Sequence, residues 1–145
     1  MAVYNKIYPK QLELGAQYDE VSLTIDERRA SRLITKTIDG KPCVIAMERG
    51  VTLRGGTILS DVNGCLLKIL AAPEEVSTVR ATSTIEMTRL AYHLGNRHVA
   101  LEITENYLRY QHDHVLDDMV RGLGGLVTEE QALFEPENGA YNHKH

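Results

Sequence analysis

Residues 83–114 read STIEMTRLAYHLGNRHVALEITENYLRYQHDH, and this stretch predicts the architecture of the C-terminal half. Ser83 and Glu86 have the spacing of a capping box, which satisfies free backbone amides at the start of a helix. Apolar side chains then follow at intervals of three and four residues, as on one face of a helix: Met87, Leu90, Ala91 and Leu94. Gly95 is predicted to end this helix.

The second part of the stretch alternates between apolar and polar residues. From His98 to Ile103 the pattern predicts a strand, with Val99, Leu101 and Ile103 facing the helices and His98 facing the opposite side. The pair Glu105-Asn106 is typical of a turn, and residues 107–110 predict the next strand. His98 is therefore expected on a sheet face that is open to solvent or to a partner.

The segments on either side of this stretch complete a recognisable order of elements. Residues 76–81 and 126–134 predict strands, and Asp113 can cap a second helix with an apolar face formed by Leu116, Met119, Val120 and Leu123. The order β-α-β-β-α-β is that of a ferredoxin-like domain. The polar tail, about residues 135–145, has no periodic pattern and is predicted to be mobile.

The first half of the chain reads differently. Short candidate strands at residues 21–25, 33–38, 44–47 and 65–70 are separated by turn pairs such as Asp39-Gly40 and Asn63-Gly64. The charged run 26–29 is interpreted as a turn or a solvated edge, and no helix is predicted. Pro73 interrupts the pattern. The sequence therefore predicts an α+β protein with an all-β sheet or small barrel at 1–73 and a ferredoxin-like domain at 74–145.

Composition narrows the classes of function. The chain has 145 residues and a formal net charge of −4, whereas a nucleic-acid binder normally carries a basic surface. It has no apolar run near the roughly 20 residues that span a bilayer, and no signal-peptide pattern. Cys43 and Cys65 lie among apolar neighbours and are predicted to be buried strand residues in a reducing cytosol. The expected location is cytoplasmic.

The histidines are the candidate chemical groups, since neutral imidazole suits nickel, copper and zinc. One copy of His98 supplies too few ligands for a metal ion, but a two-fold dimer axis beside it would supply a second imidazole. The alternative is that His98 is an ordinary surface or interface histidine. His112 and His114 could converge on one ion from an extended segment, or remain a solvated pair. His143 and His145 repeat the same spacing in the tail and are either ligands or inert. His93, near a helix C-terminus, suits a structural role.

Enzyme motifs are missing from the sequence, which contains neither a His-Glu-x-x-His motif nor a phosphate-binding glycine loop. A metal-dependent hydrolase remains an alternative, with Glu102 as its only obvious general base. A protein-interaction module with incidental histidines is another. Turnover that depends on His98 would favour the hydrolase over a metal carrier. Failure to bind any metal would favour the interaction module.

Several short motifs in the second half resemble those of the urease accessory protein UreE family, the nickel metallochaperones of urease assembly. They occur in the family's order and spacing: Gly95-Asn96-Arg97-His98, Leu108-Arg109-Tyr110, Asp113-His114-Val115-Leu116, Phe134-Glu135-Pro136-Glu137 and Gly139-Ala140-Tyr141. The resemblance covers roughly residues 76–145, and the first half is similar in its β character. The resemblance implies a homodimeric carrier rather than an enzyme.

The same resemblance implies roles for individual residues. His98 matches the metal histidine that pairs with its two-fold mate, His112 and His114 match peripheral metal positions, and His143 and His145 match C-terminal histidines that complete the Ni(II) site. Cu(II) and Zn(II) are also expected to bind. The implied partners are the urease apoprotein-accessory complex and an accessory GTPase. Gln111 replaces a histidine of some relatives, and the short tail argues against storage of many ions.

Overall fold

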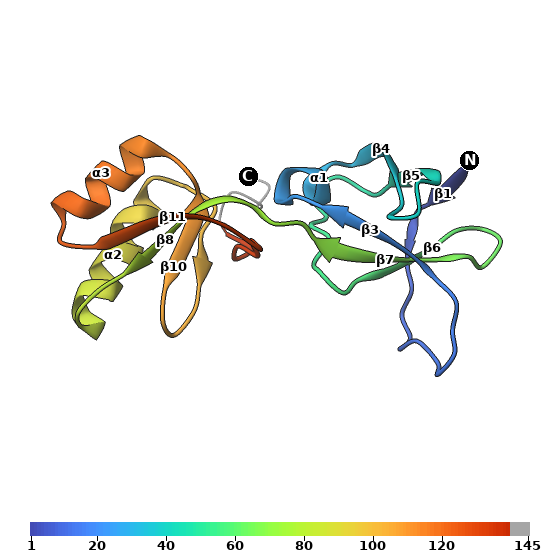
Figure 1. Cartoon of the computed structure of the whole chain (residues 1–145), viewed down its shortest axis with the longest axis horizontal. Coiled ribbons are helices and arrows are strands. Elements are labelled where there is room, and N and C mark those ends of the chain that lie inside the picture. The colour runs from blue at the N-terminus through green and yellow to red at the C-terminus, as the bar shows by residue number, and fades with distance from the viewer. Residues whose placement is uncertain (140–145) are drawn as a thin grey trace. The chain divides into compact units, whose positions relative to one another are not determined.

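The computed structural model describes residues 1–139, and the chain divides into two compact units between Ala72 and Pro73 (Figure 1). The described residues contain eleven strands and three helices. The predicted α+β class is confirmed. Within residues 1–139 no helix has the length and apolar character required to cross a membrane.

The first unit is built from two sheets around one core. Its strands are β1 (Ala2–Tyr4), β2 (Lys6–Ile7), β3 (Asp19–Leu23), β4 (Arg32–Lys36), β5 (Pro42–Ala46), β6 (Ile58–Ser60) and β7 (Leu66–Ala71). The sheet orders are β1-β5-β4 and β2-β6-β7-β3, with β1 parallel to β5 and β3 parallel to β7. The buried core side chains are Tyr4, Val21, Leu23, Cys43, Ile45, Leu53, Leu59, Leu67 and Ile69.

The charged run 26–29, interpreted from sequence as a turn or edge, is instead a short helix, α1 (Ile25–Arg29). Thr24 caps it: the Thr24 hydroxyl accepts a hydrogen bond from the Glu27 amide, and the Glu27 carboxylate accepts one from the Thr24 amide at 3.0 Å. Ile25 is buried at the start of this helix and does not continue strand β3. The alternation of apolar and polar residues at 21–25 predicted a strand through Ile25, whereas Thr24 and Glu27 form a capping box that begins a helix.

The predicted turns at Asp39-Gly40 and Asn63-Gly64 are confirmed. Gly40 and Gly64 have φ angles of 86° and 81°, which glycine adopts without steric cost, and the flanking strands pair as hairpins. Cys43 is buried in β5, but Cys65 is exposed and precedes β7, so the prediction that it is a buried strand residue was wrong. The reason is local, since the Cys65 amide donates to the Asp61 carboxylate within the turn.

The buried Tyr4 makes the stability of the first unit sensitive to alkaline pH. Burial, assisted by the negative charge of Asp19 and Asp61, raises the pKa of Tyr4 from 10.0 to about 12. The unfolded chain therefore loses this proton at lower pH than the folded chain, and stability falls as pH rises from 10 to 12. We expect Tyr4→Phe to reduce this loss, measured as the denaturation midpoint at pH 9 and pH 11. The exposed Tyr18→Phe is the matched control and should lose stability as the natural chain does.

The second unit contains β8 (Glu74–Arg80), α2 (Thr84–Asn96), β9 (Glu102–Ile103), β10 (Leu108–Gln111), α3 (His114–Gly122) and β11 (Leu126–Ala132). The sheet order is β11-β8-β10-β9, and all three pairings are antiparallel. This is the predicted ferredoxin-like arrangement (Figure 1). Both helices contribute to one core with Val79, Leu108, Tyr110 and Val127 of the strands.

Helix α2 begins as predicted, because the Ser83 hydroxyl accepts from the Glu86 amide. It ends later than predicted, since Gly95 is still helical and Arg97 is the C-cap. His98 follows in a turn, so the strand predicted from His98 to Ile103 is reduced to Glu102–Ile103. The expectation that His98 lies on the open sheet face was therefore wrong.

The first part of the predicted mobile tail is instead fixed to the domain. The Glu135 amide donates to the Glu102 carboxylate at 2.8 Å, and the Glu137 amide donates to the Leu101 carbonyl at 2.7 Å. Phe134 and Pro136 are buried. Residues 135–139 therefore run beside β9, and the rest of the predicted tail, 140–145, lies outside the described residues.

Candidate metal centre

His98 is the exposed imidazole that follows α2 directly. Its φ of 54° is positive, and it is the only non-glycine residue with positive φ in the part of the chain that the structure describes. Histidine enters this left-handed region more readily than most residues. The His98 amide donates to the Gly95 carbonyl at 3.0 Å, which holds the turn against the helix end. The backbone therefore aims this imidazole in a direction that an ordinary helix or strand would not give.

The end of the described chain lies next to His98. Both His98 and Gly139 line a pocket of about 190 Å³, which also includes Ala91, Gly95, Val99, Leu101, Ile103 and Glu137. Most of the lining residues are apolar, and His98 and Glu137 are the residues with polar side chains among them. The hydrogen bond from Glu137 to Leu101 fixes where the returning segment enters. Gly139, the last described residue, therefore lies beside His98.

An arginine on the other face of the sheet holds this returning segment. Arg109 donates to the Leu133 carbonyl at 3.1 Å and to the Thr78 hydroxyl at 3.0 Å. Its guanidinium lies 4.0 Å from Glu102, whose carboxylate accepts the Glu135 amide. Glu102 is thus occupied by structural contacts, and it is a poor candidate for the general base of a hydrolase.

His112 lies at the end of β10, half-buried among polar groups. Its Nδ1 is 3.1 Å from the Ser77 hydroxyl and 3.3 Å from a carboxylate oxygen of Asp117. Its Nε2 is 3.6 Å from a carboxylate oxygen of Glu129. The ring therefore has a carboxylate on each side.

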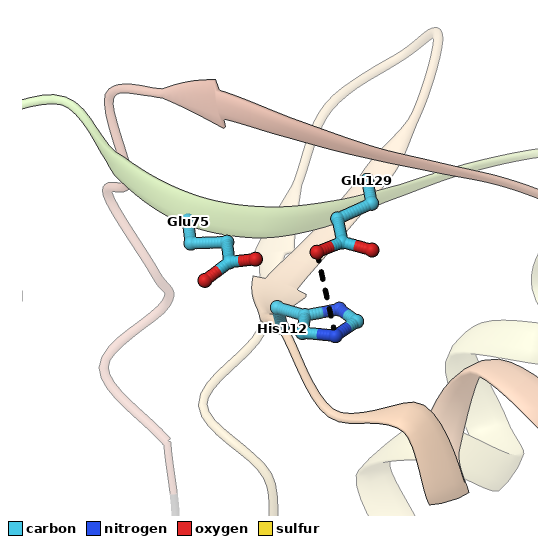
Figure 2. Close-up of side chains that lie close together, drawn as sticks. All are labelled: Glu75, His112 and Glu129. Atoms are coloured by element: carbon cyan, nitrogen blue, oxygen red, sulfur yellow. Dashed lines mark ion pairs between the residues drawn. The ribbon is translucent and has the colours of Figure 1, made fainter.

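Glu75 joins His112 and Glu129 in a candidate metal centre (Figure 2). One ligand atom from each residue lies within 4.8 Å of the other two. A shared hydrogen bond with Glu75, together with some desolvation and the nearby negative charges, raises the pKa of the Glu129 carboxyl above its ordinary value. One imidazole and two carboxylates are N and O ligands of the kind that zinc and other first-row divalent metals take.

The other predicted ligands are placed differently. His114 is exposed as the first residue of α3, and within residues 1–139 it belongs to no group of three candidate ligands. Asp113 is the N-cap of α3, and one of its oxygens accepts from the amides of Val115 and Leu116. The structure therefore does not bring His112 and His114 together with Asp113 as a ligand group. His143 and His145 lie outside the described residues.

His93 has a local aromatic contact. It lies in the last turn of α2 and makes an edge-to-face contact with Tyr92, with 5.3 Å between ring centroids. It does not line the pocket beside His98. The contact agrees with the structural role suggested by its position in the helix.

Fold and side chains together define a class: a two-unit α+β protein whose ferredoxin-like unit carries exposed imidazoles as candidate metal ligands. The family models for the UreE urease accessory protein match the chain in both halves, the N-terminal domain at residues 6–72 and the C-terminal domain at residues 74–145. The chain belongs to the UreE family of urease accessory proteins.

Individual relatives agree with the family models. The chain is 56% identical over 122 residues to a urease accessory protein UreE of Pseudomonas putida strain GB-1, covering 83% of this chain and 74% of that protein. It is 51% identical over 143 residues to the UreE of Teredinibacter turnerae, covering 98% and 91%. The family comprises accessory proteins for urease, and the chain is accordingly an accessory protein rather than an enzyme.

Proposed function

We propose that this chain is a metallochaperone that binds Ni(II) and delivers it to apo-urease during assembly of the urease active site. The observation that carries the proposal is the exposed His98 imidazole, held by a left-handed turn beside the point where the C-terminal segment returns. Backbone conformations of this kind are concentrated at functional sites. The family membership supplies the connection to urease.

A second copy of the chain completes the site in this proposal. Nickel takes more ligands than the single imidazole that one copy of His98 offers. A two-fold axis near His98 brings two imidazoles to one ion. Ile103, which lines the same pocket, is 51% exposed and offers apolar surface for such a contact. The expected stoichiometry at this site is one ion per two chains.

The C-terminal histidines can supply further ligands. His143 follows Gly139 by four residues, and four residues span at most about 14 Å. Either His143 or His145 can therefore meet an ion held at His98. A site with few protein ligands also permits release, because an acceptor can replace the imidazoles one at a time.

The remaining assignments are part of the same proposal. His112 and His114 are peripheral positions for further ions, and Cu(II) and Zn(II) compete at the imidazoles. The first unit meets the urease apoprotein-accessory complex, aided by an accessory GTPase, and the carrier acts in the cytoplasm. These assignments derive from the family resemblance.

The test is a nickel titration by calorimetry on the natural chain and on His98→Asn, with molar mass followed in parallel. Asparagine removes the imidazole but tolerates a positive φ, so the turn is kept. We expect the tightest site to weaken by more than about 100-fold, the upper end of the effect of losing an outer-shell partner. His93→Ala is the matched histidine control and should leave the site unchanged.

A second variant, His143→Ala with His145→Ala, tests the tail. We expect weaker nickel binding at an unchanged thermal midpoint without metal. A tight site at one ion per chain that survives His98→Asn would contradict the proposal.

A further inference from the structure

We propose that Glu137 supplies a carboxylate ligand to the nickel ion held at His98, and that strand β9 positions it there. The inference rests on the proposed nickel site, because it names a further ligand of the same ion. With a two-fold axis beside His98, one ion meets two imidazoles and two carboxylates. This ligand set does not depend on the histidines at the end of the chain.

The pocket beside His98 requires a negative charge if a divalent cation is to bind there. Its lining residues are apolar or glycine apart from His98 and Glu137. A neutral imidazole binds a metal ion without balancing its charge, and an uncompensated charge next to apolar surface is costly. Two copies of Glu137 balance the two charges of Ni(II). Glu137 is the acidic residue of this lining, so it is the residue that can provide the compensation.

The backbone of Glu137 is fixed beside the turn that carries His98. Its amide donates to the carbonyl of Leu101, three residues after His98, at 2.7 Å. Glu137 and His98 line the same pocket of about 190 Å³. The Glu137 side chain is exposed, so its carboxylate can rotate onto an ion at the imidazole without disturbing the packed core.

Glu102 of β9 holds the same segment two residues earlier. One oxygen of its carboxylate accepts the Glu135 amide at 2.8 Å, and the other accepts the Tyr107 hydroxyl at 3.2 Å. The Glu102 side chain is only 14% exposed, and the guanidinium of Arg109 lies 4.0 Å from it. Glu102 is therefore a positioning residue, which acts on the ion through the backbone that leads to Glu137.

The register of the sheet keeps Glu102 in place. Arg109 of β10 lies opposite Glu102 of β9 and opposite Thr78 of β8, so the three side chains form one row across the sheet. Arg109 donates to the Thr78 hydroxyl at 3.0 Å and to the Leu133 carbonyl at 3.1 Å. The segment that carries Glu137 is thus attached to the sheet at residues 133, 135 and 137.

The ligand set agrees with the proposed cargo and with its release. Two imidazoles and two carboxylates are the nitrogen and oxygen ligands that tetragonal Ni(II) and Cu(II) sites use. Each chain contributes half of the ligands, so separation of the two copies removes half of them in one step. The expected stoichiometry remains one ion per two chains.

The first experiment is a nickel titration of the full chain and of Glu137→Gln, with molar mass followed in parallel. The amide has the shape of the carboxylate but lacks its charge. We expect binding at the His98 site to weaken by at least about tenfold, the lower end of the effect of losing an outer-shell partner. Glu105→Gln is the matched control, since Glu105 is exposed and lies outside the pocket beside His98. It should change the affinity less than twofold.

Infrared difference spectroscopy detects the ligand directly. Nickel binding to the natural chain should shift a carboxylate stretching band, because the carboxylate changes from a hydrated group to a metal ligand. The shift should be absent in Glu137→Gln at a nickel concentration that saturates the variant, and present in Glu105→Gln. A purely structural role of Glu137 would leave this band shift unchanged.

Glu102→Ala tests the positioning without altering the ligand itself. In a chain that also carries His143→Ala and His145→Ala, we expect Glu102→Ala to weaken nickel binding and to speed hydrogen exchange of the Glu135 and Glu137 amides. Glu102→Gln retains an acceptor oxygen for the Glu135 amide and should restore both properties. In the Glu137→Gln background, Glu102→Ala should cause no further loss of affinity, because the two residues act through one ligand.

Natural nickel affinity in folded Glu137→Gln, or an unchanged carboxylate band shift in that variant, would overturn the inference. If His98→Asn abolishes tight binding while Glu137→Gln has no effect, the carboxylate ligand is refuted and the nickel site at His98 stands. If His98→Asn leaves tight binding unchanged, the proposed nickel site is refuted together with this ligand.

Discussion

Replacing Phe134 with alanine is expected to lower the free energy of unfolding of the second unit by about 3–5 kcal/mol. Phe134 is fully buried and is among the largest buried side chains of the described residues. Its removal leaves a cavity in the second unit and loses the transfer free energy of a whole aromatic ring. Denaturant unfolding, with hydrogen exchange of residues 73–139 as the readout, measures the change in the stability of the second unit. Leu133→Ala is the matched control, because the Leu133 side chain is 51% exposed. This substitution should lower the free energy of unfolding by less than about 1 kcal/mol.

The same variant has a consequence for metal binding. Phe134 lies between Leu133, whose carbonyl accepts from Arg109, and Glu135, whose amide donates to Glu102. Loosening this anchor frees the segment that leads past His98. We therefore expect weaker nickel binding in conditions where the Phe134→Ala protein is still folded. Unchanged stability would show that Phe134 is not a core residue, and unchanged affinity at reduced stability would show that the anchor does not serve the metal.

Replacing Arg28 with alanine is expected to destabilise the first unit by about 2–5 kcal/mol. Arg28 is fully buried in α1, and its guanidinium donates to the carbonyls of Leu23 and Leu53 at 3.2 and 3.3 Å. Removing the side chain deprives the Leu53 carbonyl of this donor, at about 1–3 kcal/mol, whereas the Leu23 carbonyl still accepts from the Ala72 amide. The cavity left by so large a buried side chain adds to the loss. The Leu53 amide also donates to the Arg28 carbonyl, so the arginine ties α1 to a segment without strand pairing.

The exposed Arg32 provides the control for that prediction. Arg32→Ala removes the same kind of side chain from β4 and should change stability by less than about 0.5 kcal/mol. Hydrogen exchange should show faster opening of residues 1–72 in the Arg28 variant and unchanged protection in the second unit. Equal destabilisation by both substitutions would mean that loss of positive charge, and not loss of the buried contacts, is responsible.

The parts of the fold that were predictable depend on local signals. Ser83 and Glu86 predict the start of α2, and Asp113 predicts the start of α3. Gly40 and Gly64 predict hairpins. Each of these residues determines the conformation of residues only a few positions away. Helix α1 also had a local signal, the capping box of Thr24 and Glu27. This helix was not predicted because the alternation of apolar and polar residues in β3 extends to Ile25, as it would in a longer strand.

The candidate site was predictable only in part. His98 and His112 stand out by residue type, but the turn that displaces His98 from a strand depends on α2 continuing through Gly95. Glu75 and Glu129 carry no local signal at all. They meet His112 because β8 pairs with both β10 and β11, a pairing across dozens of residues. Asp117 likewise looks like any first-turn helix acid until its buried contact with Tyr110 is known.

The strand order also has a consequence for synthesis on the ribosome. In the first unit every strand finds its neighbours among residues 2–71, so that unit can complete its sheets while the second is still being translated. The second unit cannot, because its central strand β8 emerges first and its partner β11 emerges last. A nascent chain that stalls before Leu126 therefore presents an unpaired edge of β8, available to a chaperone or to another nascent chain.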